Sequence, residues 1–251
     1  DAGRARTRGE YEGEECVHEI EALYVDMIES AKRFVYAENQ YFASRLIAKA
    51  IAERVKEDDP PEFVIVNPHS ADGWLEDKAM SSARAELLEF VRKCDRHGRF
   101  RLYCPVTQRR DDIYVHSKIT IVDDRLLRVG SANFNNRSMG LDSECDLLID
   151  ASQPGNDSAA DVIAKLRADL LSEHLGVSVD TVDAKLAETG SLIRAIEAFS
   201  GSEGRGLVAF IPEKTDAAGG VLAESEALDP ESAGEEFEPL ARPGLLARLR
   251  A

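Results

Sequence analysis

Short apolar runs of strand type alternate along this chain with segments in which apolar residues recur every three or four positions. The three-and-four spacing predicts helices over about residues 17–28, 46–55, 76–96, 159–175 and 180–199. Short runs rich in apolar residues predict strands over residues 34–38, 63–66, 100–104, 145–149 and 207–211. Because helices alternate with strands, we expect an α/β protein whose mixed sheet is flanked by helices on both faces.

A β-branched segment from Val115 to Val122 runs into two aspartates, which predicts a strand that ends in a turn. Residues 126–129 predict its antiparallel partner. Since side chains alternate across a strand, His116, Lys118 and Thr120 are expected on one face. The other face is expected to carry Val115, Ser117, Ile119 and Ile121. The histidine and the lysine therefore share a surface.

This hairpin carries polar residues in the pattern H-x-K-x4-D-x6-G-S-x-N, at His116, Lys118, Asp123, Gly130, Ser131 and Asn133. An imidazole can attack phosphorus, accept a proton or protonate a leaving oxygen, because its unperturbed pKa of about 6.5 lies near working pH. Lysine supplies positive charge, and glycine lets the backbone approach an anion. Asp123 lies where the strand turns, so we expect a structural role for it although it gives the pattern its third letter. Together these residues indicate half of a phosphoryl-transfer site.

These residues resemble the second HKD motif of the phospholipase D superfamily. The resemblance continues through Phe134–Asp142 to Glu144, and Phe34–Phe42 is similar to the strand and loop that precede this motif in two-motif enzymes. It covers roughly residues 16–212 and is strongest over 34–42 and 113–148. It implies a phospholipase D-like half as the fold of this region.

The resemblance also implies a two-step displacement through a covalent phosphohistidine, with no metal and no other cofactor. The expected substrate is a phospholipid, and water or an alcohol is the acceptor. In this scheme His116 is the general acid and later the base, and the nucleophile is a histidine of the other half-site. The alternatives are cardiolipin-synthase-like phosphatidyl transfer, cleavage of another phosphodiester, or an isolated half that binds phosphate without turnover.

A site of this family needs two HKD motifs, and this chain holds one. The remaining histidines, none of which is followed two positions later by a lysine, are His18, His69, His97 and His174. The second half-site is therefore expected from a missing N-terminal half or from a second copy of the chain. The missing half is favoured, because the chain opens at Asp1 without an initiator methionine and its motif resembles the C-terminal one of double-motif enzymes.

Polar residues around the motif have two interpretations each. Ser131 and Asn133 either cap the turn or contact phosphate, with contact favoured. Glu144 is expected to hydrogen-bond the ring nitrogen of the histidine that is not used for chemistry, as an acidic residue of the family does, the alternative being a surface charge. The residues after the first predicted strand either line a pocket or bond within their loop. They are Glu38, Asn39 and Gln40.

Net charge, the length of apolar runs and the spacing of cysteines limit which binding partners and sites are expected. A net charge of −16 and a sequence pI near 4.8 argue against a general nucleic-acid binder, which needs a basic surface to displace counterions. No run approaches the ~20 apolar residues of a spanning helix, so membrane contact is expected to be peripheral. The four cysteines include no C-x-x-C pair and predict neither a zinc site nor a disulfide framework.

Three regions are expected along the chain. Residues 1–15 are charged and contain glycine, which predicts a linker or the remnant of a preceding domain. Residues 16–212 form the catalytic half. From residue 213 acidic residues far outnumber basic ones up to Pro239, so residues 213–251 are expected to form an acidic, disordered tail.

Overall fold

The computed structural model describes residues 2–9, 16–70, 74–201 and 204–212. Within these ranges the strands form a single sheet in the order β2-β1-β8-β7-β6-β3-β4-β5-β9. The strands are β1 (Gly3–Arg8), β2 (Val17–His18), β3 (Phe34–Glu38), β4 (Glu62–Val66), β5 (Phe100–Val106), β6 (Ile119–Val122), β7 (Leu126–Gly130), β8 (Glu144–Asp150) and β9 (Gly206–Ala209). The helices are α1 (Glu19–Ser30), α2 (Arg45–Val55), α3 (Trp74–Cys94), α4 (Asn136–Gly140), α5 (Ala159–Leu175), α6 (Val179–Thr189) and α7 (Leu192–Glu197).

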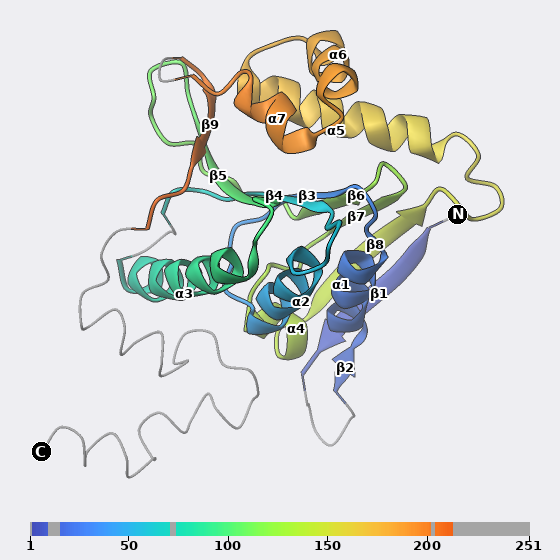
Figure 1. Cartoon of the computed structure of the whole chain (residues 1–251). Coiled ribbons are helices and arrows are strands. Elements are labelled where there is room, and N and C mark those ends of the chain that lie inside the picture. Colours follow the sequence, from blue (N-terminus) through green and yellow to red (C-terminus); the bar gives the residue numbers. More distant parts are fainter. Residues whose placement is uncertain (1, 10–15, 71–73, 202–203, 213–251) are drawn as a thin grey trace, which may run out of the picture.

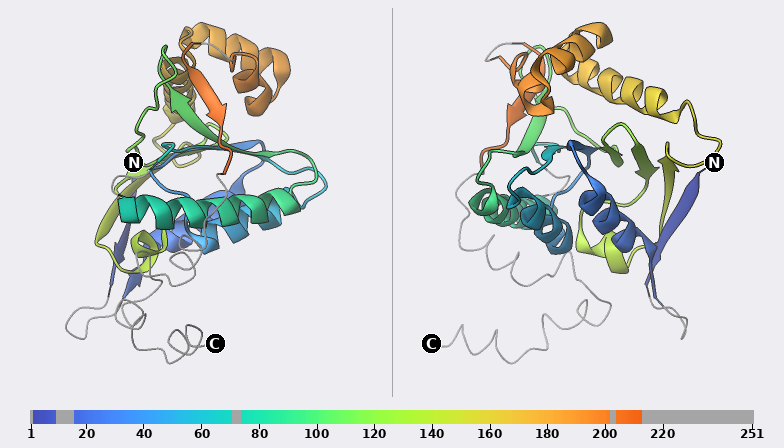
Figure 2. Two further views of the ribbon diagram at one scale, coloured as in Figure 1. Left: turned by 90° about the vertical axis from the view of Figure 1, so that its left-hand side faces the viewer. Right: turned by 45° about the vertical axis from the view of Figure 1, so that its right-hand side comes forward.

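The sheet is mixed and covered on both faces. Strands β3, β4 and β5 run parallel, and the other neighbouring strands pair antiparallel. Helices α1 to α4 lie on one face and α5 to α7 on the other (Figure 1 and Figure 2). Each face has its own apolar cluster, the first built with residues of α1, α2 and α3 and the second with residues of α5, α6 and α7. This architecture confirms the predicted α/β fold.

The N-terminal segment differs from the prediction. A linker over residues 1–15 is wrong for Gly3–Arg8, which form β1 between β2 and β8. Ala5 and Thr7 are buried, whereas the intervening arginines face outward, and this charged alternation concealed the strand in the sequence. The rest of the predicted linker (residues 1 and 10–15) and the predicted acidic tail (residues 213–251) lie outside the described residues. None of the helices in the described ranges has both the length and the apolar character needed to cross a bilayer.

The motif strand is shorter than predicted, because β6 begins at Ile119 and residues 113–118 form no regular strand. The predicted alternation nevertheless holds. Val115, Ile119 and Ile121 pack in the cluster beneath α5 to α7, and Val122 packs in the opposite cluster. The segment that carries the histidine and the lysine is therefore extended but lies ahead of the paired strand.

Asp123 fastens the far end of β6 to the start of β3. Its carboxylate accepts hydrogen bonds from the backbone N–H groups of Lys32, Arg33 and Phe34, at 2.7, 2.8 and 2.8 Å. These three bonds confirm the structural role expected for this residue. Since β6 separates it from His116, the aspartate lies at the opposite end of the strand from the histidine.

A buried ion pair ties the motif strands together. Arg128 in β7 and Asp146 in β8 are both fully buried, and Arg128 Nε donates to Asp146 Oδ2 at 2.7 Å. The same guanidinium donates to the carbonyls of Lys118 and Ala132, at 2.9 Å each, and lies over the Tyr24 ring at 4.7 Å. One buried cation thus joins the entry to β6, strand β7, strand β8 and the loop after β7.

The ion pair also explains a glycine of the motif. A Cβ built on Gly130 would lie 1.9 Å from Asp146 Oδ1 and 2.7 Å from the Asp146 Cα, so no larger residue fits without moving β8. The sequence suggested that this glycine lets the backbone approach an anion. The structure instead shows that Gly130 makes room for the buried carboxylate.

We predict that Asp146→Asn lowers the free energy of unfolding by about 3–5 kcal/mol, because it leaves a buried guanidinium without its counter-charge. Chemical denaturation followed by circular dichroism measures this. The matched control is Glu19→Gln, which weakens the solvent-exposed Arg6–Glu19 pair and should leave the free energy of unfolding nearly unchanged. Equal effects of the two substitutions would contradict a central role for the buried pair.

Candidate active site

His116 and Lys118 lie at the edge of the sheet where the parallel strands end. Because β6 runs antiparallel to β3, its first residue, Ile119, pairs with Glu38, the last residue of β3. The residues just before β6 therefore lie beside the carboxyl ends of β3 and β4. Ligand clefts of α/β proteins form at this edge of the sheet.

Lys118 is buried and held in place by two hydrogen bonds. Its side chain is 8% exposed, and Nζ donates to Gln40 Oε1 at 3.1 Å and to the backbone carbonyl of His116 at 2.9 Å. Burial lowers the pKa of Lys118 from its ordinary value. The charge of Glu144 opposes this shift, and the charge of Arg128 adds to it. The lysine thus places a fixed, poorly hydrated positive charge beside the histidine backbone.

The His116 side chain, by contrast, is exposed. Its ring stacks on that of Tyr114, with centroids 6.3 Å apart and planes inclined by 20°. The Tyr114 hydroxyl accepts a hydrogen bond from Gln40 Nε2 at 2.8 Å, and the same amide binds the lysine through its oxygen. Gln40 therefore links the lysine to the aromatic neighbour of an imidazole that solvent can reach.

Glu144 has partners other than the expected one. Its carboxylate accepts hydrogen bonds from the hydroxyl of Ser131 and from Ser138 Oγ, the latter at 2.7 Å. Ser131 Oγ also accepts from the backbone N–H of Cys145 at 3.1 Å. The described hydrogen bonds of Glu144 therefore fix the loop after β7 and the start of α4, and its expected bond to the imidazole stays a prediction.

The loop that contains Asn133 is tied to the segment after β3. The backbone N–H of Asn133 donates to Ser138 Oγ at 3.0 Å. Asn39 Oδ1 accepts from the backbone N–H groups of Phe134 and Tyr41, at 2.9 and 3.2 Å. The carbonyl of Phe134 in turn accepts from two backbone N–H groups, at residues 43 and 44. The loop after β7 and the segment after β3 are therefore joined by several hydrogen bonds.

The three residues at the end of the first predicted strand support the site through hydrogen bonds. Glu38, Asn39 and Gln40 are 4%, 0% and 9% exposed. Each makes a hydrogen bond to another segment of this region. Asn39 accepts from the backbone N–H of Phe134, Gln40 donates to the Tyr114 hydroxyl, and Glu38 accepts from the Ser117 hydroxyl. Of the two interpretations of these residues, the structure shows hydrogen bonding between loops, and burial removes them from an open lining.

Several residues that sequence reasoning did not single out shape this region. They are Tyr114, Ser117, Ser138, Arg128, Asp146 and His174. Ser117 lies inside the motif, so the alternation of the strand could have indicated its inward direction. Contacts such as that between Glu38 and His174, 136 residues apart, leave no local pattern in the sequence.

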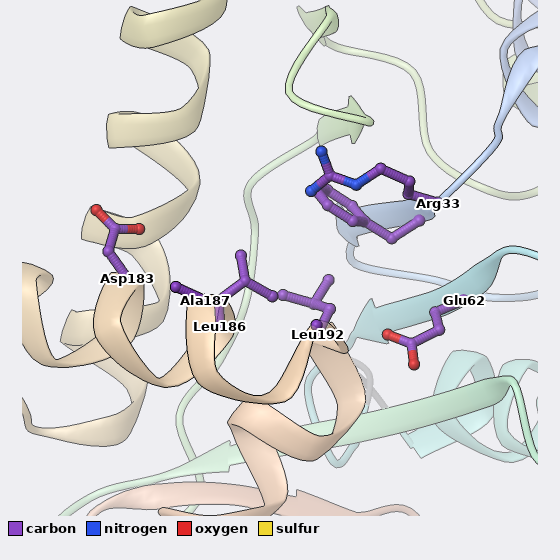
Figure 3. Close-up of a pocket in the computed structure, with 8 residues that line it drawn as sticks. Arg33, Glu62, Asp183, Leu186, Ala187 and Leu192 are labelled. Carbon is purple, nitrogen blue, oxygen red and sulfur yellow. The ribbon is translucent and has the colours of Figure 1, made fainter.

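A pocket of about 350 Å³ lies elsewhere, at the opposite end of the sheet. Its lining includes Arg33 and Phe34 at the start of β3, Glu62 at the start of β4, and Leu186 and Leu192 from α6 and α7. Figure 3 shows these leucines facing Arg33 across the opening. Since Glu38 lies four positions after Phe34 in β3, roughly 13 Å of strand lies between this pocket and the candidate site. The pocket is therefore not part of the site.

Comparison with known proteins places the chain in a family. A family model described as phospholipase D matches residues 45–196, more than half of the chain. Phospholipase D of Phytophthora infestans is 29% identical over 216 residues, covering 64% of this chain and 12% of the relative. Phospholipase D zeta 1 of Arabidopsis thaliana is 30% identical over 220 residues, covering 68% of this chain and 20% of the relative. This chain thus spans a fifth or less of the length of these two relatives.

Among solved structures, phosphatidylserine synthase of Haemophilus influenzae is similar at 17% identity with a TM-score of 0.48, covering 64% of this chain and 37% of that chain. The family model spans the whole motif from His116 to Glu144, so the resemblance seen in the sequence is confirmed. The chain belongs to the phospholipase D family.

Proposed function

We infer that this chain supplies one of two half-sites of a phospholipase D type enzyme, which cleaves or transfers the phosphodiester of a phospholipid through a phosphohistidine. One observation carries this proposal. At the carboxyl edge of the sheet, the exposed imidazole of His116 lies next to the buried ammonium of Lys118, which is held by hydrogen bonds. The first group can exchange protons with a substrate, and the second can hold a phosphate oxygen.

The lysine is suited to bind a phosphodiester anion. A charge partly removed from water interacts with an approaching anion in a lower effective dielectric, which strengthens the attraction. Its bonds to Gln40 Oε1 and to the His116 carbonyl fix its position before substrate arrives. Pre-organised positive charge of this kind stabilises the additional negative charge that develops on phosphoryl oxygens in the transition state.

His116 is assigned as the general acid. In the first step the histidine of the other half-site attacks phosphorus, the bond from phosphorus to the alcohol oxygen breaks, and protonated His116 gives its proton to that oxygen. In the second step neutral His116 takes a proton from water or an acceptor alcohol, whose oxygen displaces the nucleophilic histidine. Both histidines then return to their starting states, so the two steps require no metal ion, oxidant or reductant.

The remaining motif residues complete the half-site. Ser131 and Asn133 are proposed as neutral donors to phosphate, with the Ser131 hydroxyl anchored by Glu144. Glu144 lies close enough to Lys118 for its charge to affect the pKa of that ammonium. A carboxylate in that place is also proposed to make the expected hydrogen bond to the imidazole. Glu38, Asn39 and Gln40 act as supports rather than substrate contacts.

The second half-site is proposed to come from another part of a longer protein, with a second copy of this chain as the alternative. The chain holds a single H-x-K pattern, and it covers only 12% and 20% of the two relatives described above. Contact with lipid is then proposed to be peripheral, at the surface where the two half-sites meet.

We predict that this chain alone shows negligible turnover of a phosphatidylcholine analogue. A longer protein that joins it to a second H-x-K-x4-D segment should hydrolyse the analogue in the presence of EDTA, because the chemistry needs two histidines and no divalent ion. Release of the head group measures the activity. If EDTA abolished the rate and a divalent metal restored it, the mechanism would be contradicted. If the isolated chain were fully active, the second half-site would have to come from another copy of the chain, and light scattering should then detect a symmetric dimer.

In the two-motif protein, His116→Ala should lower the rate by about 10²–10⁴, the loss typical of a positioned acid or base. The matched control is His97→Ala, since His97 is exposed and lies between α3 and β5. The control should retain full activity. A His116→Ala protein as active as the control would remove this histidine from the site.

Lys118→Met should lower kcat/KM at least tenfold while the protein remains folded, because the methionine fills a similar volume but carries no charge to hold the phosphate. Lys32→Met is the control, since the Lys32 side chain is exposed. Head-group release and circular dichroism are measured on both. An unchanged kcat/KM in a folded Lys118→Met protein would exclude the lysine from phosphate binding.

A further inference from the structure

Regular strand pairing does not extend to the segment that carries His116. Regular pairing of β6 begins at Ile119, opposite Glu38 of β3 and Val129 of β7, so residues 113–118 have no strand ladder. The position of the imidazole therefore depends on individual anchors. On one face, Arg128 Nη1 and the backbone N–H of Gly130 both donate to the Lys118 carbonyl, at 2.9 and 3.3 Å.

On the other face the anchor is Ser117, which binds a buried carboxylate. Ser117 Oγ donates to Glu38 Oε2 at 2.6 Å. The other carboxylate oxygen, Oε1, accepts from the Tyr36 hydroxyl at 2.7 Å and is 3.0 Å from His174 Nε2. His174 lies in the last turn of α5, so the carboxylate joins three segments that are far apart in the sequence: strand β3, the motif and the helix layer above.

This carboxylate is charged in spite of its burial. Glu38 is 4% exposed and His174 is 9% exposed. Burial alone would raise the pKa of the Glu38 carboxyl, but the hydrogen bond and charge interaction with His174, together with the hydrogen bonds from Ser117 and Tyr36, leave that pKa below its ordinary value. Hydrogen bonds to a buried charge are stronger than those between neutral groups. The anchor on Ser117 is therefore a charge-assisted one.

We propose that Glu38 and His174 are positioning residues for His116, which they hold in place through the Ser117 hydroxyl. The imidazole ring of His174 orients the carboxylate, the carboxylate fixes Ser117, and Ser117 fixes the backbone on which the exposed imidazole is carried. This inference deepens the proposed function and rests on it for the chemical meaning of the His116 position. The geometry of the anchor itself does not depend on turnover.

The test on the chain as it stands is NMR of its histidine rings after labelling histidine with ¹⁵N. The ring signals of His116 are assigned by their loss in His116→Gln. Ser117→Ala and Glu38→Gln should each move these signals. In the Ser117→Ala background, Glu38→Gln should produce no further shift, because the hydroxyl that connects the two groups is gone. Ser117→Thr, which keeps a hydroxyl, should restore the signals toward their positions in the unsubstituted chain.

Two results would overturn the proposal. The first is a Glu38→Gln shift of the same size with and without the Ser117 hydroxyl, which would show that the carboxylate acts only through its electric field. The second is an unchanged His116 spectrum in Ser117→Ala. The control is Ser172→Ala, because the Ser172 hydroxyl binds only a carbonyl of its own helix, and it should leave the His116 signals unmoved. Circular dichroism reports that each variant is folded.

Activity of the two-motif protein gives an independent readout. Ser117→Ala should lower kcat by about ten- to a hundredfold with little change in KM, as expected for a misplaced catalytic group rather than lost binding. A raised KM with unchanged kcat would contradict positioning. If the two-motif protein shows no activity at all, the proposed function fails, while the NMR coupling still decides whether Glu38 sets the position of His116 through the Ser117 hydroxyl.

Discussion

The arrangement of the motif depends on one buried ion pair, between Arg128 and Asp146. Its guanidinium bonds the carbonyls on either side of the β6–β7 hairpin, at Lys118 and Ala132, and its carboxylate occupies the space that a side chain at position 130 would need. A buried ion pair gains little over apolar packing in stability, but losing either partner is expensive. Strands β7 and β8 and the entry to β6 are therefore constrained together.

This constraint explains how a reactive segment can stand outside the regular sheet and still be ordered. The backbone at Lys118 is held from one face by Arg128, and the backbone at Ser117 is held from the other by the carboxylate of Glu38. Between these anchors the lysine is buried and the histidine is exposed. The anchored backbone thus presents the His116 imidazole to solvent beside the fixed positive charge of Lys118. Such rigidity lets a site meet its substrate without reorganising.

Sequence patterns predicted the long, periodic elements well. Helix α5 begins and ends at the predicted residues because its apolar spacing is regular and Gly176 follows it in a left-handed conformation.

The alternation around His116 was also correct. The patterns missed β1, whose arginines suggested a linker, and placed the start of β6 four residues early, because β-branched residues continue beyond the paired ladder. The sequence left two interpretations open for Glu38, Asn39 and Gln40, since a strand end looks the same in sequence whether its polar groups face a cleft or a neighbouring loop. The pairs Arg128–Asp146 and Glu38–His174 depend on tertiary contacts that leave no local signal.

The most direct test of the account follows the two steps separately in a two-motif protein carrying His116→Ala, with a phosphodiester whose nitrophenol leaving group needs no protonation. If His116 is the acid and later the base, this protein should release a burst of one nitrophenol per active site. Steady turnover should then be far slower than in the unsubstituted protein, because the phosphohistidine cannot be resolved efficiently. Steady turnover equal to that of the unsubstituted protein would contradict any role for His116 in the chemistry.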